Sequence, residues 1–245
     1  MNPIVLIPSR MAATRLPGKP LADIHGRAMI LHVMDRAREA DIGPVAVACG
    51  DPEIADAIRA AGGTAILTDP TLPRGSDRVH AALSALDPHG AHDVIVNLQG
   101  DLPTIPPAYL RAVLAPLSDP AIDIATLVAP ILTKEESDAP SVVKAAVAFE
   151  GGRAVSPALY FSRAPIPHGD GPRWHHIGIY AFRRQALARF VALPESPLER
   201  RESLEQLRAL EAGMRISCAR VEHAPFGVDT PADLERARAD LSPKA

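Results

Sequence analysis

Short apolar segments that alternate with amphipathic helical segments dominate the first half of this chain and constrain its fold most. The apolar segments are bounded by turn residues and cover residues 4–7, 45–49, 64–67, 94–98 and 123–128. Helical periodicity or capping signals occur between them, over 27–40, 52–62, 77–86 and 107–117. Apolar strands joined through helices are typical of a parallel sheet that is buried on both faces. We therefore predict an α/β fold with a mixed, mostly parallel sheet flanked by helices.

The second half of the chain has a different pattern. Residues 142–149, 158–163 and 175–182 are strand-like with hardly any helix between them, which favours antiparallel pairing. A helix over 203–212, a strand over 215–221 and a terminal helix over 229–241 follow, and the last begins with Thr230 as N-cap and Pro231 at the first helical position. We predict one domain over 1–245, with a core of 1–130 and 215–245 and an antiparallel subregion at 131–214.

Composition and charge exclude several classes of protein. The 245 residues are 47% hydrophobic, and Lys plus Arg number 26 against 29 Asp plus Glu. No basic cluster offers the surface that nucleic acid requires. No segment reaches the ~20 apolar residues of a membrane span, and the first apolar segment is too short for a signal-peptide core. We expect a cytoplasmic protein with no nucleic-acid or membrane partner, in which Cys49 and Cys218 are buried thiols.

Three cations lie in one loop after the first predicted strand. Arg10, Arg15 and Lys19 occur in IPSRMAATRLPGKPL, at residues 7–21. Ligands bind outside the carboxyl ends of parallel strands, so this loop lies on the functional edge of the sheet. It is not a Walker A loop, because Pro20 stands where Ser or Thr is required. The pattern favours a site for a polyanion such as phosphate.

Carboxylates and a helix entrance supply further candidates. Asp101 directly follows the strand at 94–98, and Asp229 lies in VDTPAD. Two carboxylates with substrate phosphates could hold Mg²⁺ if the fold brings them together; helix capping is the alternative for Asp229. Ser76, Asp77 and Arg78 lie at a helix entrance, where backbone N–H groups can receive polar ligand atoms. Capping is the alternative there too.

Motifs spread over almost the whole chain resemble one family, the 3-deoxy-manno-octulosonate cytidylyltransferases, or CMP-Kdo synthetases. The resemblance rests on IPSRMAATRLPGKPL, QGD, PSVVKA, LYFSRAPIP, HHIGIYAF, SPLERRESLEQLR and GVDTPADL. It implies a Rossmann-like nucleotidyltransferase fold, usually a homodimer. It also implies an enzyme that joins CTP to the acid sugar Kdo and releases pyrophosphate, with a product that feeds lipopolysaccharide synthesis.

The resemblance also implies roles for individual residues. Lys19, Asp101 and Asp229 would be catalytic, and the two aspartates would bind Mg²⁺. The nucleotide would be held by Arg10, Arg15, Lys19, Asp51, Ser76, Asp77 and Arg78. The sugar would be held by Gln99, Arg163, His176, Tyr180, Glu205 and Gln206. The subregion at 131–214 would carry sugar binding and dimerisation.

Two positions depart from the family pattern. Leu102 follows Asp101 where family members have Glu, and Gly50 stands where they often have a polar residue. Leucine cannot make the hydrogen bonds of a carboxylate. Two other functions stay open beside the one that the resemblance implies, and Leu102 bears on the second of them. One is cytidylyl transfer to another acid sugar, 8-amino-Kdo or an acylneuraminate. The other is a CTP-binding protein that performs no chemistry.

Overall fold

The computed structural model describes residues 1–12 and 15–242, and the chain forms two compact units. The first comprises Met1–Leu110 and Pro225–Ala245, and the second comprises Arg111–Ala224. The sequence placed these boundaries near 130 and 215. The segments at 124–130 and 216–220 fall in the second unit because they pair with each other and with strands of that unit. Assignment of all 245 residues to a single domain stays a prediction.

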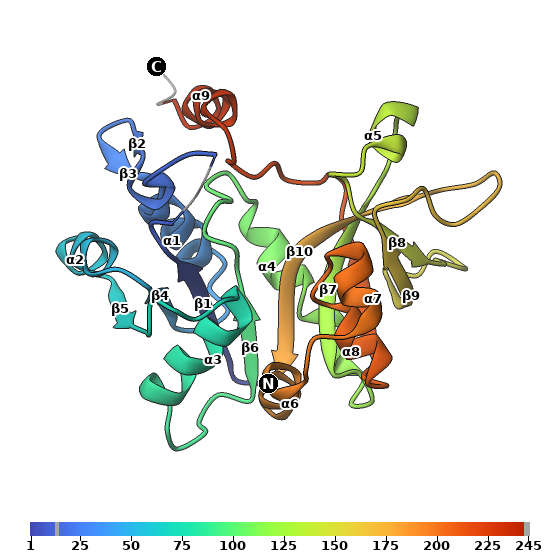
Figure 1. Cartoon of the computed structure of the whole chain (residues 1–245), viewed down its shortest axis with the longest axis horizontal. Coiled ribbons are helices and arrows are strands. Elements are labelled where there is room, and N and C mark those ends of the chain that lie inside the picture. The colour runs from blue at the N-terminus through green and yellow to red at the C-terminus, as the bar shows by residue number, and fades with distance from the viewer. Residues whose placement is uncertain (13–14, 243–245) are drawn as a thin grey trace. The chain divides into compact units, whose positions relative to one another are not determined.

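The first unit contains the predicted parallel sheet. Its strands are β1 (Pro3–Ser9), β4 (Val45–Cys49), β5 (Thr64–Leu67) and β6 (Val94–Asn97). Their order is β5-β4-β1-β6, and every pairing among them is parallel. Helices pack against these strands (Figure 1), namely α1 (Met29–Glu39), α2 (Pro52–Ala60) and α3 (Gly75–Leu86). The α/β architecture predicted for this part is confirmed.

Helix α1 shows how the sequence specifies an element of this unit. Its apolar residues at spacings i, i+3, i+4 and i+7 are buried, namely Ile30, Val33, Met34 and Ala37. The helix begins at Met29 rather than at 27 because a short hairpin precedes it. That hairpin pairs β2 (Asp23–Ile24) with β3 (Arg27–Ala28). Before the hairpin, η1 (Lys19–Leu21) forms a single 3₁₀ turn.

The C-terminal helix α9 (Pro231–Asp240) belongs to the first unit and begins as predicted. Thr230 Oγ1 accepts a hydrogen bond from the Asp233 N–H at 3.2 Å, and the Asp233 carboxylate accepts from the Thr230 N–H at 2.9 Å. Such a capping box satisfies N–H groups that the first helical turn leaves unpaired. The helix then packs through an apolar cluster formed by Ile24, Met29, Val228, Leu234 and Ala237.

The second unit contains the predicted antiparallel strands. They are β7 (Ile124–Pro130), β8 (Lys144–Val147), β9 (Val155–Ser162), β10 (Trp174–Arg183) and β11 (Ile216–Arg220). β7 and β11 are parallel, whereas β10–β7, β11–β9, β8–β9 and β10–β8 are antiparallel. Because β8 pairs with both β9 and β10, the pairings run from β10 through β7, β11, β9 and β8 and back to β10. Antiparallel pairing at 142–182 is confirmed.

Several helices differ from the sequence-based expectation. They are α4 (Pro107–Ala112), which leads from the first unit into the second, η2 (Ala115–Ser118), α5 (Lys134–Asp138), α6 (Arg184–Ala192), α7 (Pro197–Glu202) and α8 (Leu207–Glu211). The helix expected over 203–212 is present only from Leu207, as α8, because Ser203 has a left-handed φ of 53° and ends α7. The helix expected over 107–117 also divides, since Pro116 has no N–H to donate.

Two expectations about the chain as a whole can be compared with the structure. Within residues 1–12 and 15–242, no helix is long and apolar enough to cross a membrane. Cys49 and Cys218 are free and buried, and burial raises the pKa of both thiols, that of Cys49 to about 12. Both are buried thiols, as predicted, and they are therefore protonated near neutral pH.

Candidate functional site

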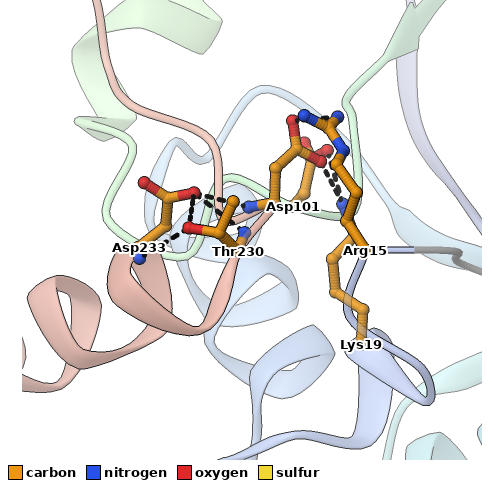
Figure 2. A network of polar contacts seen from close by, with 6 residues as sticks. Arg15, Lys19, Asp101, Thr230 and Asp233 are labelled. Carbon is orange, nitrogen blue, oxygen red and sulfur yellow. Dashed lines mark hydrogen bonds and ion pairs between the residues drawn. The ribbon is translucent and has the colours of Figure 1, made fainter.

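Two aspartates that are far apart in the sequence meet at one lysine in the first unit. The Lys19 Nζ lies 3.0 Å from Asp101 Oδ2 and 3.1 Å from Asp229 Oδ1. Arg15 contacts the other oxygen of Asp229, with Nη2 2.9 Å from Oδ2. Figure 2 shows this cluster beside the capping box of α9. The fold thus brings together both predicted magnesium ligands and two of the three cations of the 7–21 loop.

Each part of the cluster has a local cause. Gly18, with a left-handed φ of 69°, forms the N-cap of η1 and lets the chain turn so that Lys19 begins it. Asp101 follows β6 at the carboxyl edge of the parallel sheet. The Val228 N–H donates to the Asp101 carbonyl at 2.9 Å, which ties the segment before α9 to this edge. Thr230 provides the N-cap of α9, so the Asp229 carboxylate faces the cations and does not cap the helix.

Charge balance keeps Lys19 protonated. Its side chain is only 16% exposed, and that burial lowers the pKa of its ammonium group. The carboxylates of Asp101 and Asp229 offset the burial, and the net result is a pKa above the ordinary value. A charged ammonium group is therefore held between two carboxylates at the sheet edge.

A cavity of about 310 Å³ opens beside this cluster in the first unit. Of the predicted site residues, its described lining includes Arg10, Lys19, Arg78, Gln99 and Asp101. Sequence reasoning missed two polar residues of this lining, Ser9 and Arg74. A signal existed for both, since Ser9 lies within the motif at 7–21 and Arg74 lies two residues before Ser76. The lining thus combines four cations with one carboxylate, which suits a polyanionic ligand.

The donor set fits a magnesium ion that is shared with a substrate. Among the residues that the structure describes, no three His, Cys, Asp or Glu side chains gather into a metal-binding group. Mg²⁺ does not require such a cage, because it is commonly held by one or two carboxylates together with phosphate oxygens and water. Asp101 and Asp229 supply two hard oxygen ligands that lie close together, since both contact Lys19 Nζ.

Of the residues predicted to lie near the nucleoside, some line the cavity and others hold the surrounding loops in place. The Arg78 guanidinium donates to Thr68 Oγ1 at 2.5 Å and to the Asp69 carbonyl at 3.2 Å, and so supports the loop before α3. The Asp51 carboxylate accepts from the Met11 N–H at 2.7 Å and anchors the cationic loop. Asp51, Ser76 and Asp77 are not among the described lining residues of the cavity. Their contacts with nucleotide stay predictions.

The two departures from the family pattern have structural explanations. A Cβ atom at Gly50 would lie 2.9 Å from Arg78 Nη1 and 3.2 Å from Arg10 Cβ, so glycine lets these side chains approach the backbone. The Leu102 side chain is buried, and its carbonyl accepts from the Ile105 N–H at 3.2 Å. An apolar side chain is therefore suited to this buried position.

In the second unit, a β-bulge in β10 organises His176 and Tyr180. The register with β7 shifts between Ile177 and Tyr180. The Thr126 hydroxyl lies 3.1 Å from the Ile177 carbonyl and 2.8 Å from that of Ile179, so it donates to the bulge. Its oxygen then accepts from His176 Nε2 at 3.0 Å. Burial lowers the pKa of His176 to about 3, so the imidazole is neutral near pH 7.

The other predicted sugar residues of this unit surround the turn between α7 and α8. The Arg163 side chain donates to the carbonyls of Glu202 and Ser203, at 2.8 and 3.2 Å. Burial raises the pKa of Tyr180, and the nearby Glu205 carboxylate raises it further. Gln206 is the N-cap of α8 and is 5% exposed, and its Nε2 has no hydrogen-bond partner among the described residues. Gln99 lies in the first unit.

Residues 196–208, which carry the SPLERRESLEQLR motif, stabilise the turn between α7 and α8. Ser196 and Glu199 form a capping box at the start of α7. The buried Glu199 carboxylate also pairs with the Arg208 guanidinium of α8, where Arg208 Nε lies 2.8 Å from Oε2. A buried, bidentate pair of this kind fixes the geometry of the groups between its partners. The motif therefore holds Glu205 and Gln206 in place.

Comparisons with known proteins identify the family of this chain. A family model described as Cytidylyltransferase matches residues 4–216. A 3-deoxy-manno-octulosonate cytidylyltransferase of Rhodospirillum centenum is 64% identical, covering 99% of this chain and 95% of the relative. One from Methylobacterium radiotolerans is 62% identical, covering 98% and 97%.

Solved structures show the same relationship. A structure of CMP:2-keto-3-deoxy-manno-octonic acid synthetase complexed with CTP has a TM-score of 0.89 and 42% identity, with 98% of each chain covered. A nucleotidyl transferase from Methanothermobacter thermautotroptrophicus has a TM-score of 0.61 and 15% identity, covering 97% of this chain and 96% of that one, and shows the fold alone. The predicted nucleotidyltransferase fold is confirmed. The chain belongs to the 3-deoxy-manno-octulosonate cytidylyltransferase family.

Proposed function

We propose that this chain transfers CMP from CTP to the anomeric 2-hydroxyl of Kdo and releases pyrophosphate. The observation that carries this proposal is the meeting of Asp101, Asp229 and Lys19 at the edge of a cation-lined cavity. Relatives of 64% and 62% identity bear the name of this activity. The CTP-bound structure with a TM-score of 0.89 supports CTP as the nucleotide substrate.

Both substrates are anions, so charge neutralisation is the first task of the site. Two like unit charges 4 Å apart repel by about 4 kcal/mol at an effective dielectric constant of 20. Arg10 and Lys19 in the cavity lining, with Arg15 beside Asp229, would offset the repulsion between the Kdo carboxylate and the triphosphate. The same cations would stabilise charge that develops on the transferring phosphoryl group.

Asp101 and Asp229 would hold Mg²⁺, and Lys19 would act beside them. When bound, the ion would neutralise phosphate charge and lower the pKa of the attacking hydroxyl group. In-line attack at the α-phosphorus requires that the entering and leaving oxygens lie on opposite sides. The cationic loop would fix the triphosphate in that orientation, because Asp51 ties its backbone to the end of β4.

Neutral polar groups of the second unit would select the sugar. His176 is uncharged near pH 7, and the buried Gln206 Nε2 can donate hydrogen bonds. Buried groups that remain unpaired with a wrong ligand discriminate more strongly than apolar contacts do. With Gln99, Arg163, Tyr180 and Glu205, they would distinguish Kdo from other acid sugars. As part of this proposal, the enzyme acts in the cytoplasm as a homodimer, and its product feeds lipopolysaccharide synthesis.

A coupled assay of pyrophosphate release tests the proposal. CTP is offered with Kdo, 8-amino-Kdo or an acylneuraminate, with Mg²⁺ present or chelated. We expect release with Kdo that chelation abolishes and added Mg²⁺ restores. Preference for another sugar would reassign the acceptor. CTP binding without release with any sugar would make the chain a nucleotide-binding protein without this activity.

A further inference from the structure

The hydroxyl of Ser9 is buried in the wall of the cavity without a partner. Ser9 is 6% exposed, and its Oγ has no hydrogen-bond partner among the residues that the structure describes. Buried polar side chains are nearly always hydrogen-bonded, because an unpaired group loses its interaction with water and gains nothing. Ser9 is also a described lining residue of the cavity. A bound ligand is therefore the natural partner for this hydroxyl.

The backbone holds Ser9 firmly at the carboxyl end of β1. Its carbonyl accepts from the Gly50 N–H at 2.9 Å, and its Cα is in register with Cys49 of β4. The preceding Pro8 packs under the start of α3, where a Cβ atom at Gly75 would lie 3.3 Å from Pro8 Cγ. The hydroxyl is thus positioned by the sheet itself, and no flexible loop sets its place.

The surroundings of Ser9 favour the nucleoside part of a nucleotide over its phosphates. Pro8, Pro20 and Leu72 contribute apolar surface to the same cavity, and a nucleobase packs its flat faces on such surface. The phosphates are drawn to cations, which this cavity offers at Arg10 and Lys19. A neutral hydroxyl in a cavity that also offers this apolar surface matches the neutral polar edge of a base or ribose.

We propose that Ser9 is a nucleotide-binding residue whose hydroxyl forms a hydrogen bond with the base or ribose of CTP. This inference rests on the proposed use of CTP and adds a contact that selects the nucleoside. It leads to one expectation for ligand binding and one for the stability of the free protein. Loss of the hydroxyl should weaken binding, and it should not destabilise the fold, since the hydroxyl has no hydrogen-bond partner to lose among the residues that the structure describes.

The test compares Ser9→Ala with a matched control, Ser217→Ala. Ser217 is also buried, at 2% exposed, but its hydroxyl donates to the Ser156 carbonyl at 3.0 Å. Dissociation constants are measured by calorimetry for CTP, CMP and tripolyphosphate, and the unfolding midpoint is measured without ligand. We expect Ser9→Ala to raise the Kd for CTP and CMP about threefold to tenfold, the scale of one net hydrogen bond. We expect unchanged tripolyphosphate binding and an unfolding midpoint that is equal or higher.

Each other outcome would overturn the inference. If Ser9→Ala binds CTP with wild-type affinity, the hydroxyl forms no hydrogen bond that contributes to CTP binding. A lower unfolding midpoint like that expected for Ser217→Ala would assign the hydroxyl a structural role. Equal losses for CTP and tripolyphosphate would assign it to the phosphates. Because the readout is binding, a wild-type protein that binds CTP but releases no pyrophosphate would refute the proposed function and leave this contact standing.

Discussion

Asp101→Asn separates the structural role of the acidic pair from its proposed catalytic role. The amide oxygen of asparagine can still accept from Lys19 Nζ, which lies 3.0 Å from the carboxylate in the wild-type protein. Asp229 remains as a second partner at 3.1 Å. The Asp101 side chain is 28% exposed, so solvent screens much of the lost attraction. We expect a stability loss of at most about 1 kcal/mol, or roughly 2–4 °C in Tm for a chain of this size.

The expected loss of activity is much larger. Removal of one electrostatic stabiliser typically costs about 10² in turnover, equivalent to roughly 2.7 kcal/mol at the transition state. The assay measures pyrophosphate release from CTP and Kdo at increasing Mg²⁺ concentration. We expect a lower kcat and a higher Mg²⁺ requirement, because one hard oxygen ligand has lost its charge.

Asp56→Asn provides the control, because the Asp56 side chain is 76% exposed and lies outside the cavity lining. It should leave both turnover and Mg²⁺ requirement unchanged. The reasoning fails if Asp101→Asn turns over at near the wild-type rate with the same Mg²⁺ dependence. It also fails if the loss of turnover is fully explained by unfolded protein in the thermal melt.

Three further predictions concern other parts of the chain. Gln206→Ala should lower kcat/KM for Kdo by about 10- to 100-fold, the scale of a buried polar contact, while CTP affinity stays within twofold; equal losses in both would contradict the sugar role. Gly50→Ser should weaken CTP binding and destabilise the fold by about 1–3 kcal/mol in urea, because its Cβ would lie 2.9 Å from Arg78 Nη1; wild-type behaviour would show that Arg78 moves aside freely. Burial of neutral His176 lowers its pKa from 6.5 to about 3, so between these values the unfolded chain binds a proton that the folded chain does not. Stability should therefore fall as pH drops below 6.5, by up to about 1.4 kcal/mol per pH unit, and urea unfolding of His176→Asn should show a shallower pH slope; an unchanged slope would contradict a neutral, buried imidazole.

The parallel half of the fold was readable from local pattern because its strands are buried on both faces. The bounds predicted for the strands at 45–49 and 64–67 agree with β4 and β5. The start of α9 was also readable, since an N-cap and a proline act within one helical turn. The end of α7 and the start of α8 could not be predicted in this way. They depend on a left-handed Ser203 and on the buried pair of Glu199 with Arg208, which joins the two helices. Side-chain contacts across a turn leave no periodic signal.

The sequence by itself determined which chemical groups this protein has and on which strand ends they stand. It placed Arg10 and Lys19 after β1 and Asp101 after β6, because strand ends can be located from apolar segments and the groups that follow them lie at one edge. Only the tertiary structure decided that Asp229 joins them. That meeting depends on α9 packing against β2 and α1 and on the backbone hydrogen bond from Val228 to Asp101. Contacts between segments so distant in sequence arise from packing of the whole unit, so no local pattern contains them.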